Sequence, residues 1–132
     1  MEYAKNCYDA FVDEMILHGT FHANVFATIH RDATNYLFDK MEEKGMYGYV
    51  GKVNMDCNSP EFLIETTEES LNETEKYLAA HEGSKKIKTI LAPRFAPTCS
   101  EKLITGLGKL AEKYHCGVHT HLVESIWEAQ EP

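Results

Sequence analysis

Helical and strand patterns alternate along this chain without a linker, and this alternation restricts its fold more than any other feature. Apolar residues recur every three or four positions in some stretches, and the stretches between them are short and apolar on both faces, as in parallel strands covered by helices. The expected helices span 3–18, 32–44, 66–81 and 100–114, the expected strands span 21–29, 46–55, 87–92 and 117–122, and another helix begins near Trp127. The sequence therefore predicts an α/β fold with a parallel sheet.

Two architectures fit this order: a doubly wound open sheet and a segment of a (β/α)8 barrel. A glycine-rich phosphate loop after the first strand would favour the open sheet, but the Gly-x-Gly sequence from Gly106 to Gly108 falls within a helix. Polar residues instead collect after the strands, where barrel enzymes place their chemistry. These residues are His30, Asn54, Asp56, Arg94, His121 and Glu124. Their positions favour a partial (β/α)8 barrel.

Composition argues against several classes of protein. The 132 residues carry a net charge of −8, whereas nucleic acids and anionic membrane surfaces attract clustered Lys and Arg. The four cysteines are widely spaced and form no Cys-x-x-Cys pair, so we expect a reducing, cytoplasmic environment. We recognise no signal peptide and no apolar run near the roughly 18 residues that a membrane-spanning helix needs.

The stretch from His119 to Glu124 carries the strongest chemical signal. Side chains alternate between the faces of a strand, so His119 and His121 point the same way, and Glu124 follows just past the strand end. Imidazole and carboxylate groups at the mouth of a parallel sheet suit metal-assisted hydrolysis. Each residue also has a structural interpretation: His121 as a hydrogen-bonded core histidine, Glu124 as a solvated loop acid and His119 as a lining of the barrel interior.

Arg94 follows the third expected strand and precedes Phe95. A guanidinium at that place suits recognition of a planar carbonyl or an anion, or else a salt bridge to a neighbouring helix. Phe95 either stacks on a planar ligand or plugs the top of a barrel. His30 is interpreted as a neighbour of a helix N-terminus rather than as a third inward-facing group.

Five motifs occur in order over nearly the whole chain, and their combination is far more specific than any one of them. They are Phe26-Ala-Thr-Ile-His30, Tyr49-Val-Gly-Lys-Val-Asn-Met-Asp56, Glu65-Thr-Thr-Glu-Glu-Ser70, Pro93-Arg-Phe-Ala-Pro-Thr-Cys-Ser100 and His121-Leu-Val-Glu124. Through them the chain resembles the guanine deaminase family of the amidohydrolase superfamily. The resemblance implies a (β/α)8 barrel that binds one zinc ion and hydrolyses guanine to xanthine and ammonia. Residues 1–132 would be a single segment of it, supplying strands two to five and lacking the N- and C-terminal parts.

The resemblance also implies roles for four residues. His121 matches the zinc-binding histidine after strand five, and Glu124 matches the glutamate that moves protons between the activated water and the base. Arg94 and Phe95 match the pair that holds the purine. Zinc activates water at neutral pH, and a positioned carboxylate contributes general acid–base catalysis worth roughly 10²–10⁴-fold.

The family's other metal ligands, a His-x-His pair and a later histidine and aspartate, are expected before Met1 and after Pro132. We therefore expect the isolated chain to be inactive. Because it has open sheet edges, we also expect it to self-associate as a homo-oligomer, to aggregate or to stay partly molten. Two alternatives stay open: a deaminase or chlorohydrolase of the same superfamily that acts on another heterocycle, and a non-catalytic fragment or interaction module. The ligand types would also accept iron.

Overall fold

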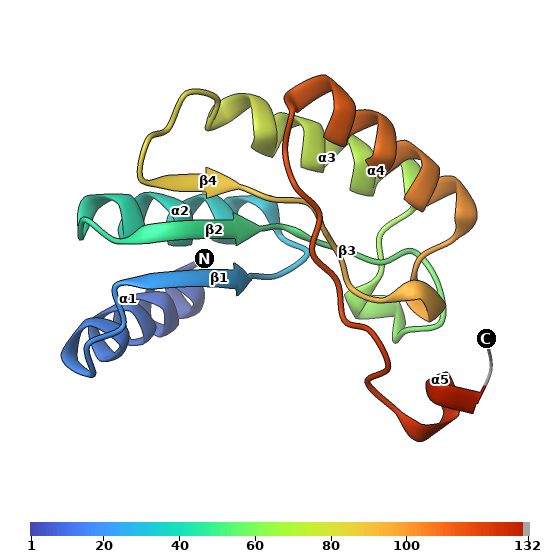
Figure 1. Cartoon of the computed structure of the whole chain (residues 1–132), viewed down its shortest axis with the longest axis horizontal. Helices are drawn as coiled ribbons and strands as arrows, with labels where there is room; N and C mark the ends of the chain where they lie inside the picture. The colour runs from blue at the N-terminus through green and yellow to red at the C-terminus, as the bar shows by residue number, and fades with distance from the viewer. Residues whose placement is uncertain (131–132) are drawn as a thin grey trace.

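Figure 1 shows the computed structural model of the chain, which describes residues 1–130. Its α-helices are α1 (Glu2–Leu17), α2 (Arg31–Glu43), α3 (Thr67–Ala80), α4 (Glu101–Tyr114) and α5 (Ile126–Gln130). Its strands are β1 (His22–Phe26), β2 (Tyr47–Gly51), β3 (Val53–Asn54), β4 (Ile87–Thr89) and β5 (Ala92–Pro93). The 3-10 turns η1 (Glu61–Leu63) and η2 (Ala96–Thr98) precede α3 and α4. The predicted α/β class is confirmed.

Within the described range every strand pair is parallel, and the strands pair in the order in which their βα units follow one another along the chain. β1 pairs with β2 and β2 with β4, while β3 and β5 form a second short ladder beyond them. Three backbone hydrogen bonds of 3.0 Å join residues 117–121 to residues 91–94. This sequential order is that of a barrel wall, whereas a doubly wound sheet reverses its order at a switch point.

The strands are shorter than predicted. The expected strands that end early or divide are 21–29, 46–55 and 87–92. The expected strand 117–122 is wrong as a regular strand, because only Val118 forms a bridge, to Leu91. Within residues 1–130 this segment makes its backbone hydrogen bonds to residues 91–94 alone, so no second strand helps to hold it in a regular ladder.

Helices cover one face of the sheet, and the main core lies there. Figure 1 shows α2 behind the sheet and α3 and α4 above it. The buried side chains of this core include Val12, Leu37, Phe38, Met41, Val50, Tyr77, Ile87, Leu91, Leu103 and Leu107. The opposite face carries no helix in the described part of the chain, and Tyr47 on β2 is 54% exposed. In a (β/α)8 barrel the helix-free face is the interior.

Capping interactions fix the starts of α3 and α4 as predicted. The Thr66 hydroxyl accepts the Glu69 N–H at 3.2 Å, and the Glu69 carboxylate accepts the Thr66 N–H at 3.0 Å, which completes a capping box. The Ser100 hydroxyl accepts the Leu103 N–H at 3.1 Å.

None of the helices within residues 1–130 has the length and apolar character needed to cross a membrane.

Asp56, in the loop after β3, joins the starts of both helices. Its carboxylate accepts hydrogen bonds from the Thr67 hydroxyl (2.6 Å), the Ser100 hydroxyl (2.6 Å) and the Ser100 N–H (2.7 Å). Burial by itself would raise the pKa of Asp56, but the hydrogen bonds from Ser100 and Thr67 outweigh it and lower the pKa. The loop is therefore held to α3 and α4 by an ionised carboxylate.

Candidate active site

A cavity of about 290 Å³ lies at the carboxyl ends of the strands. Two polar side chains, Arg94 and His121, reach it from neighbouring segments. Thr28 also lines it, and the remaining lining residues are apolar and include Phe26, Ile29, Val53, Met55 and Leu63. A small apolar cavity with a few convergent polar groups is typical of a site for a small molecule.

A larger hollow, of about 820 Å³, lies between α3 and α4, away from Arg94 and His121. Its lining includes lysines, glutamates, threonines and leucines, and none of its lining residues is a histidine or a cysteine. Size alone therefore does not identify the site, and the smaller cavity is the better candidate because a histidine and an arginine meet there at the carboxyl ends of the strands.

His121 is held by a backbone carbonyl. Its Nδ1 lies 3.0 Å from the carbonyl oxygen of Arg94, and because a carbonyl only accepts hydrogen bonds, Nδ1 donates. The neutral ring therefore keeps its lone pair on Nε2. Metal-ligating histidines are commonly fixed in this way, with one ring nitrogen bonded to a carbonyl and the other on the metal. The hydrogen bonding of His121 thus fits a metal ligand.

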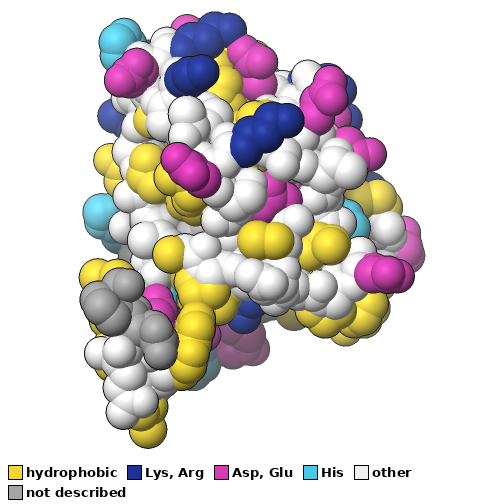
Figure 2. All heavy atoms as spheres, turned by 90° about the vertical axis from the view of Figure 1, so that its right-hand side faces the viewer, with side chains coloured by type: hydrophobic (Ala, Val, Ile, Leu, Met, Phe, Trp, Pro, Cys, Tyr) yellow, Lys and Arg dark blue, Asp and Glu magenta, His cyan; other side chains and the backbone are white. Residues whose placement is uncertain are grey.

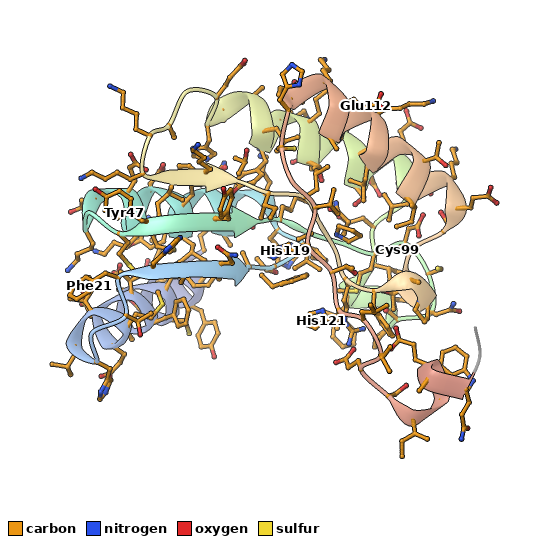
Figure 3. The ribbon with its side chains drawn as sticks, viewed as in Figure 1. Phe21, Tyr47, Cys99, Glu112, His119 and His121 are labelled. Atoms are coloured by element: carbon orange, nitrogen blue, oxygen red, sulfur yellow. The ribbon has the colours of Figure 1, made fainter. Side chains whose placement is uncertain are left out.

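His119 and His121 point to the same side of their segment, as predicted, and both lie near the ends of the strands in Figure 3. The ring of Phe26 contacts both imidazoles. Its centroid is 4.0 Å from that of His119, with the planes 19° apart, and 4.5 Å from that of His121, with the planes 41° apart. Sequence reasoning missed Phe26, whose signal is its place as the last residue of β1 on the interior face.

His119 lines the interior and is not open to a ligand. Its Nε2 is buried without a hydrogen-bonding partner, at a point where a Cβ on Gly51 would lie only 2.9 Å away. Burial first, and then the neighbouring His121, lower the pKa of His119, so this imidazole is neutral at about pH 7. The geometry favours the structural interpretation of His119.

The other predicted site residues lie outside this cavity. Phe95 packs against its neighbour, with the guanidinium carbon of Arg94 4.8 Å from the ring centroid, which is a cation–π contact. Glu124 is exposed just before α5, and its backbone N–H donates to a carboxylate of that helix at 2.8 Å. His30 is exposed at the N-cap of α2, as its structural interpretation predicted. The structure brings Arg94 and His121 together but leaves Phe95 and Glu124 outside the cavity.

Two polar residues that were expected to gather with the site face the helices instead. The Asn54 side chain donates hydrogen bonds to the hydroxyls of Ser70 (2.9 Å) and Thr74 (2.7 Å) in α3, and it is fully buried. Asp56 binds the starts of α3 and α4. Asn54 is the last residue of β3 and Asp56 lies in the loop after it, but both side chains point to the helices, so they stabilise the fold and do not enter the cavity.

The segment that carries Glu124 presents apolar side chains to solvent. Figure 2 shows hydrophobic side chains at the lower end of the molecule, around the C-terminal helix, and Leu122, Ile126 and Trp127 are all well exposed. Val123 has φ of +57°, a left-handed conformation that is costly for a β-branched residue.

Within residues 1–130 no three His, Cys, Asp or Glu side chains gather as a metal site.

Parallel βα units whose strands pair in chain order, with a histidine and an arginine at the strand ends, are typical of a segment of a (β/α)8 barrel. The family model described as "Amidohydrolase family" matches residues 1–131. The chain belongs to the amidohydrolase family.

Curated guanine deaminases are similar to nearly all of this chain. The protein from Dictyostelium discoideum is 35% identical over 125 residues, covering 93% of this chain and 28% of its own length. The Homo sapiens protein is 36% identical over 134 residues, and the match covers 98% of this chain and 29% of the human protein. The chain thus spans less than a third of the length of these relatives.

Solved structures give the same result. The guanine deaminase of C. acetobutylicum, with guanine bound in its active site, has a TM-score of 0.93 and 42% identity, and the match covers 96% of this chain and 30% of that one. The E. coli guanine deaminase has a TM-score of 0.86 and 35% identity, with the same coverage. An adenosine deaminase of Xanthomonas campestris with bound zinc has a TM-score of 0.84 at 18% identity over 98% of this chain and 28% of that one, and so shares the fold.

Proposed function

We propose that residues 1–132 form one segment, strands two to five, of a guanine deaminase barrel, and that this segment contributes part of the site that converts guanine and water into xanthine and ammonia. The observation that carries the proposal is the double use of Arg94. Its carbonyl oxygen holds Nδ1 of His121 at 3.0 Å, and its side chain lines the cavity that His121 also lines. One residue thereby connects the expected metal side of the site to the expected substrate side.

His121 is the residue of this chain that would hold a zinc ion, through Nε2. Bound zinc supplies an activated water molecule at neutral pH. The remaining ligands would come from other strands of the barrel, because barrel enzymes assemble their sites from several strand ends. In the same proposal, the open sheet edges and the exposed apolar side chains near α5 are covered in the assembled, homo-oligomeric enzyme.

The other site residues bind substrate and move protons. The Arg94 guanidinium would donate to the carbonyl oxygen of the purine and so fix the orientation of its ring. Phe95 would keep that guanidinium in place through the cation–π contact, which favours one side-chain position. Glu124 would take a proton from the attacking water and pass it to the ring nitrogen. It would then take the proton of the newly added hydroxyl group and pass it to the departing amine, so that ammonia leaves as the carbonyl group of xanthine forms.

The test needs a complete barrel. The guanine deaminase of C. acetobutylicum is a suitable host because its matching segment has a TM-score of 0.93. We would exchange that segment for residues 1–130 and follow guanine turnover and zinc content together. Arg94→Ala should raise the KM for guanine, and Glu124→Gln should lower kcat by about 10²–10⁴-fold with zinc retained. His121→Ala should lower the zinc content.

Arg31→Ala is the matched control, because Arg31 is the other arginine of this chain and makes ion pairs with Asp32 and Glu73. It should leave KM unchanged. A folded chimaera that retains zinc but does not convert guanine would contradict the proposal, and turnover of another aminated heterocycle in its place would identify the alternative substrate class. An unchanged KM in Arg94→Ala would remove Arg94 from the substrate site.

A further inference from the structure

The Phe26 ring contacts both imidazoles of the site, and a glycine makes this arrangement possible. In the β1–β2 ladder Phe26 is directly opposite Gly51. Because Gly51 has no side chain, the imidazole of His119 occupies the space beside it, and a Cβ there would lie 2.9 Å from Nε2. The His119 ring then stacks on Phe26 almost face to face, at 4.0 Å. We call Phe26, His119 and His121 the aromatic column.

Among the described residues, one hydrogen bond and the contact with Phe26 bear on the ring of His121. The residue is exposed, and its side chain makes one hydrogen bond, from Nδ1 to the Arg94 carbonyl. A single hydrogen bond holds one atom of the ring but allows the ring plane to turn about that bond. The Phe26 ring, 4.5 Å away and tilted by 41°, restricts the plane of His121.

We propose that Phe26 is a positioning residue for His121, holding its imidazole in the orientation and tautomer in which Nδ1 donates to Arg94 and Nε2 is left for a metal ion. His119, which stacks on Phe26, and Gly51, which lies opposite it in the ladder, support the Phe26 ring. The inference rests on the proposed function for the identity of the metal ion, but the ring orientation that it describes exists without one.

The first experiment reads the tautomer of each of the seven histidines by long-range ¹H–¹⁵N spectra of the 132-residue chain, at about pH 8, where ordinary imidazoles are neutral. In the unchanged chain His121 should be the Nδ1–H tautomer. Phe26→Leu should give a mixture of tautomers, and Phe26→Tyr, which keeps the ring, should restore the single form.

Phe38→Leu is the matched control. Phe38 stacks on His81 with centroids 3.8 Å apart and planes 26° apart, in the core and away from the cavity. Its replacement should alter the His81 signal and leave His121 unchanged. A single His121 tautomer in Phe26→Leu would overturn the proposal, as would averaged His121 signals in the unchanged chain. Loss of the His81 signals in Phe26→Leu would show an effect on the whole fold and would overturn it too.

The second experiment measures zinc affinity by competition with a chelator in the chimaera. Removing a residue that orients a metal ligand typically lowers affinity about 10–100-fold, and this is the loss expected for Phe26→Leu, with Phe26→Tyr close to the unchanged protein. An unchanged affinity in Phe26→Leu would overturn the proposal. Absence of guanine turnover alongside these two results would refute the proposed substrate but not the positioning role.

Discussion

The ion pair between Lys52 and Glu65 should contribute more to stability than an exposed pair of the same length. Lys52 Nζ and Glu65 Oε2 are 2.6 Å apart, the Lys52 side chain is 0% exposed and that of Glu65 is 16% exposed. The ammonium has one further hydrogen bond, to the Val53 carbonyl at 3.3 Å. Replacing Glu65 with alanine therefore leaves a buried positive charge with a single weak partner.

The expected magnitudes differ between the two partners. Removing one partner of a buried pair costs about 3–5 kcal/mol, and because Glu65 is partly exposed we expect about 3 kcal/mol for Glu65→Ala. Lys52→Met leaves only a carboxylate that water can reach, so its cost should be about 1–2 kcal/mol. The double variant has no unpaired charge and should cost about as much as Lys52→Met alone. The coupling energy of the pair is then about 3 kcal/mol.

The assay is urea unfolding of the four proteins of this double-mutant cycle. The Lys113–Glu75 pair is the matched control, since its Nζ–Oε1 distance is also 2.6 Å while its side chains are 61% and 38% exposed. Its coupling energy should be below about 1 kcal/mol. Equal coupling energies for the buried and the exposed pair would refute the reasoning, because burial is the difference on which it depends.

The same pair gives a pH dependence. Burial lowers the pKa of Lys52, and the neighbouring Glu65 acts in the opposite direction. Between the folded-state pKa and the unfolded value of about 10.4, the unfolded chain binds more protons, so stability rises with pH in that interval. Glu65→Ala lowers the folded-state pKa further. Its stability deficit should therefore be largest at about pH 7 and shrink towards about pH 10, and a deficit independent of pH would contradict this account.

Two further changes have clear expectations. Asp56→Asn removes a carboxylate of lowered pKa, so it should lower the free energy of unfolding by about 2 kcal/mol at neutral pH. The contribution of Asp56 to stability is lost as pH falls below about 3.9 and through the folded-state pKa. The urea midpoints of the variant and the parent should therefore converge in acid. Gly48 has φ of +135°, and Gly48→Ala would place a Cβ 1.9 Å from the Ala23 carbonyl oxygen. This variant should not fold, which circular dichroism would detect as a loss of helical signal. Gly108→Ala, with nothing within 4 Å, should instead stabilise α4 by about 0.5–1 kcal/mol, and equal effects of the two alanines would be inconsistent with this packing.

Helix boundaries were predictable because their signals are local. Thr66 and Ser100 cap their helices as expected, and Gly45, at φ of +75°, follows the end of α2. Strand ends were overextended for the opposite reason. Residues 27–29 look like a continuation of β1, and Ala27 and Thr28 still make backbone hydrogen bonds of 3.0 Å to Gly51 and Val53. The regular strand nevertheless ends at Phe26, and Ile29 joins a second apolar cluster beside the cavity. Such departures depend on tertiary packing rather than on neighbouring residues.

The site was predictable in part. The sequence pattern indicated that Arg94 and His121 both follow strands, and the structure brings them to one cavity. It contained no signal for the Lys52–Glu65 pair or for Phe26 against the imidazoles, because both are contacts between segments far apart in the chain. A polar residue at the end of a strand is also not enough to identify a site residue, because the Asn54 side chain donates a hydrogen bond to Ser70 in α3.

The face of each strand separates residues that stabilise the fold from residues that are placed for chemistry. Along β2 and β3 the even-numbered Val50, Lys52 and Asn54 are buried on the helix side, whereas the odd-numbered Gly51, Val53 and Met55 border His119 or the cavity. Along 91–95 the alternation places Leu91 in the helix-side core and Arg94 in the cavity, and leaves Phe95 outside it. Changes on the helix side should therefore alter the free energy of unfolding. Changes on the interior side, at Phe26, Arg94 or His121, should alter metal binding or the KM of the assembled enzyme.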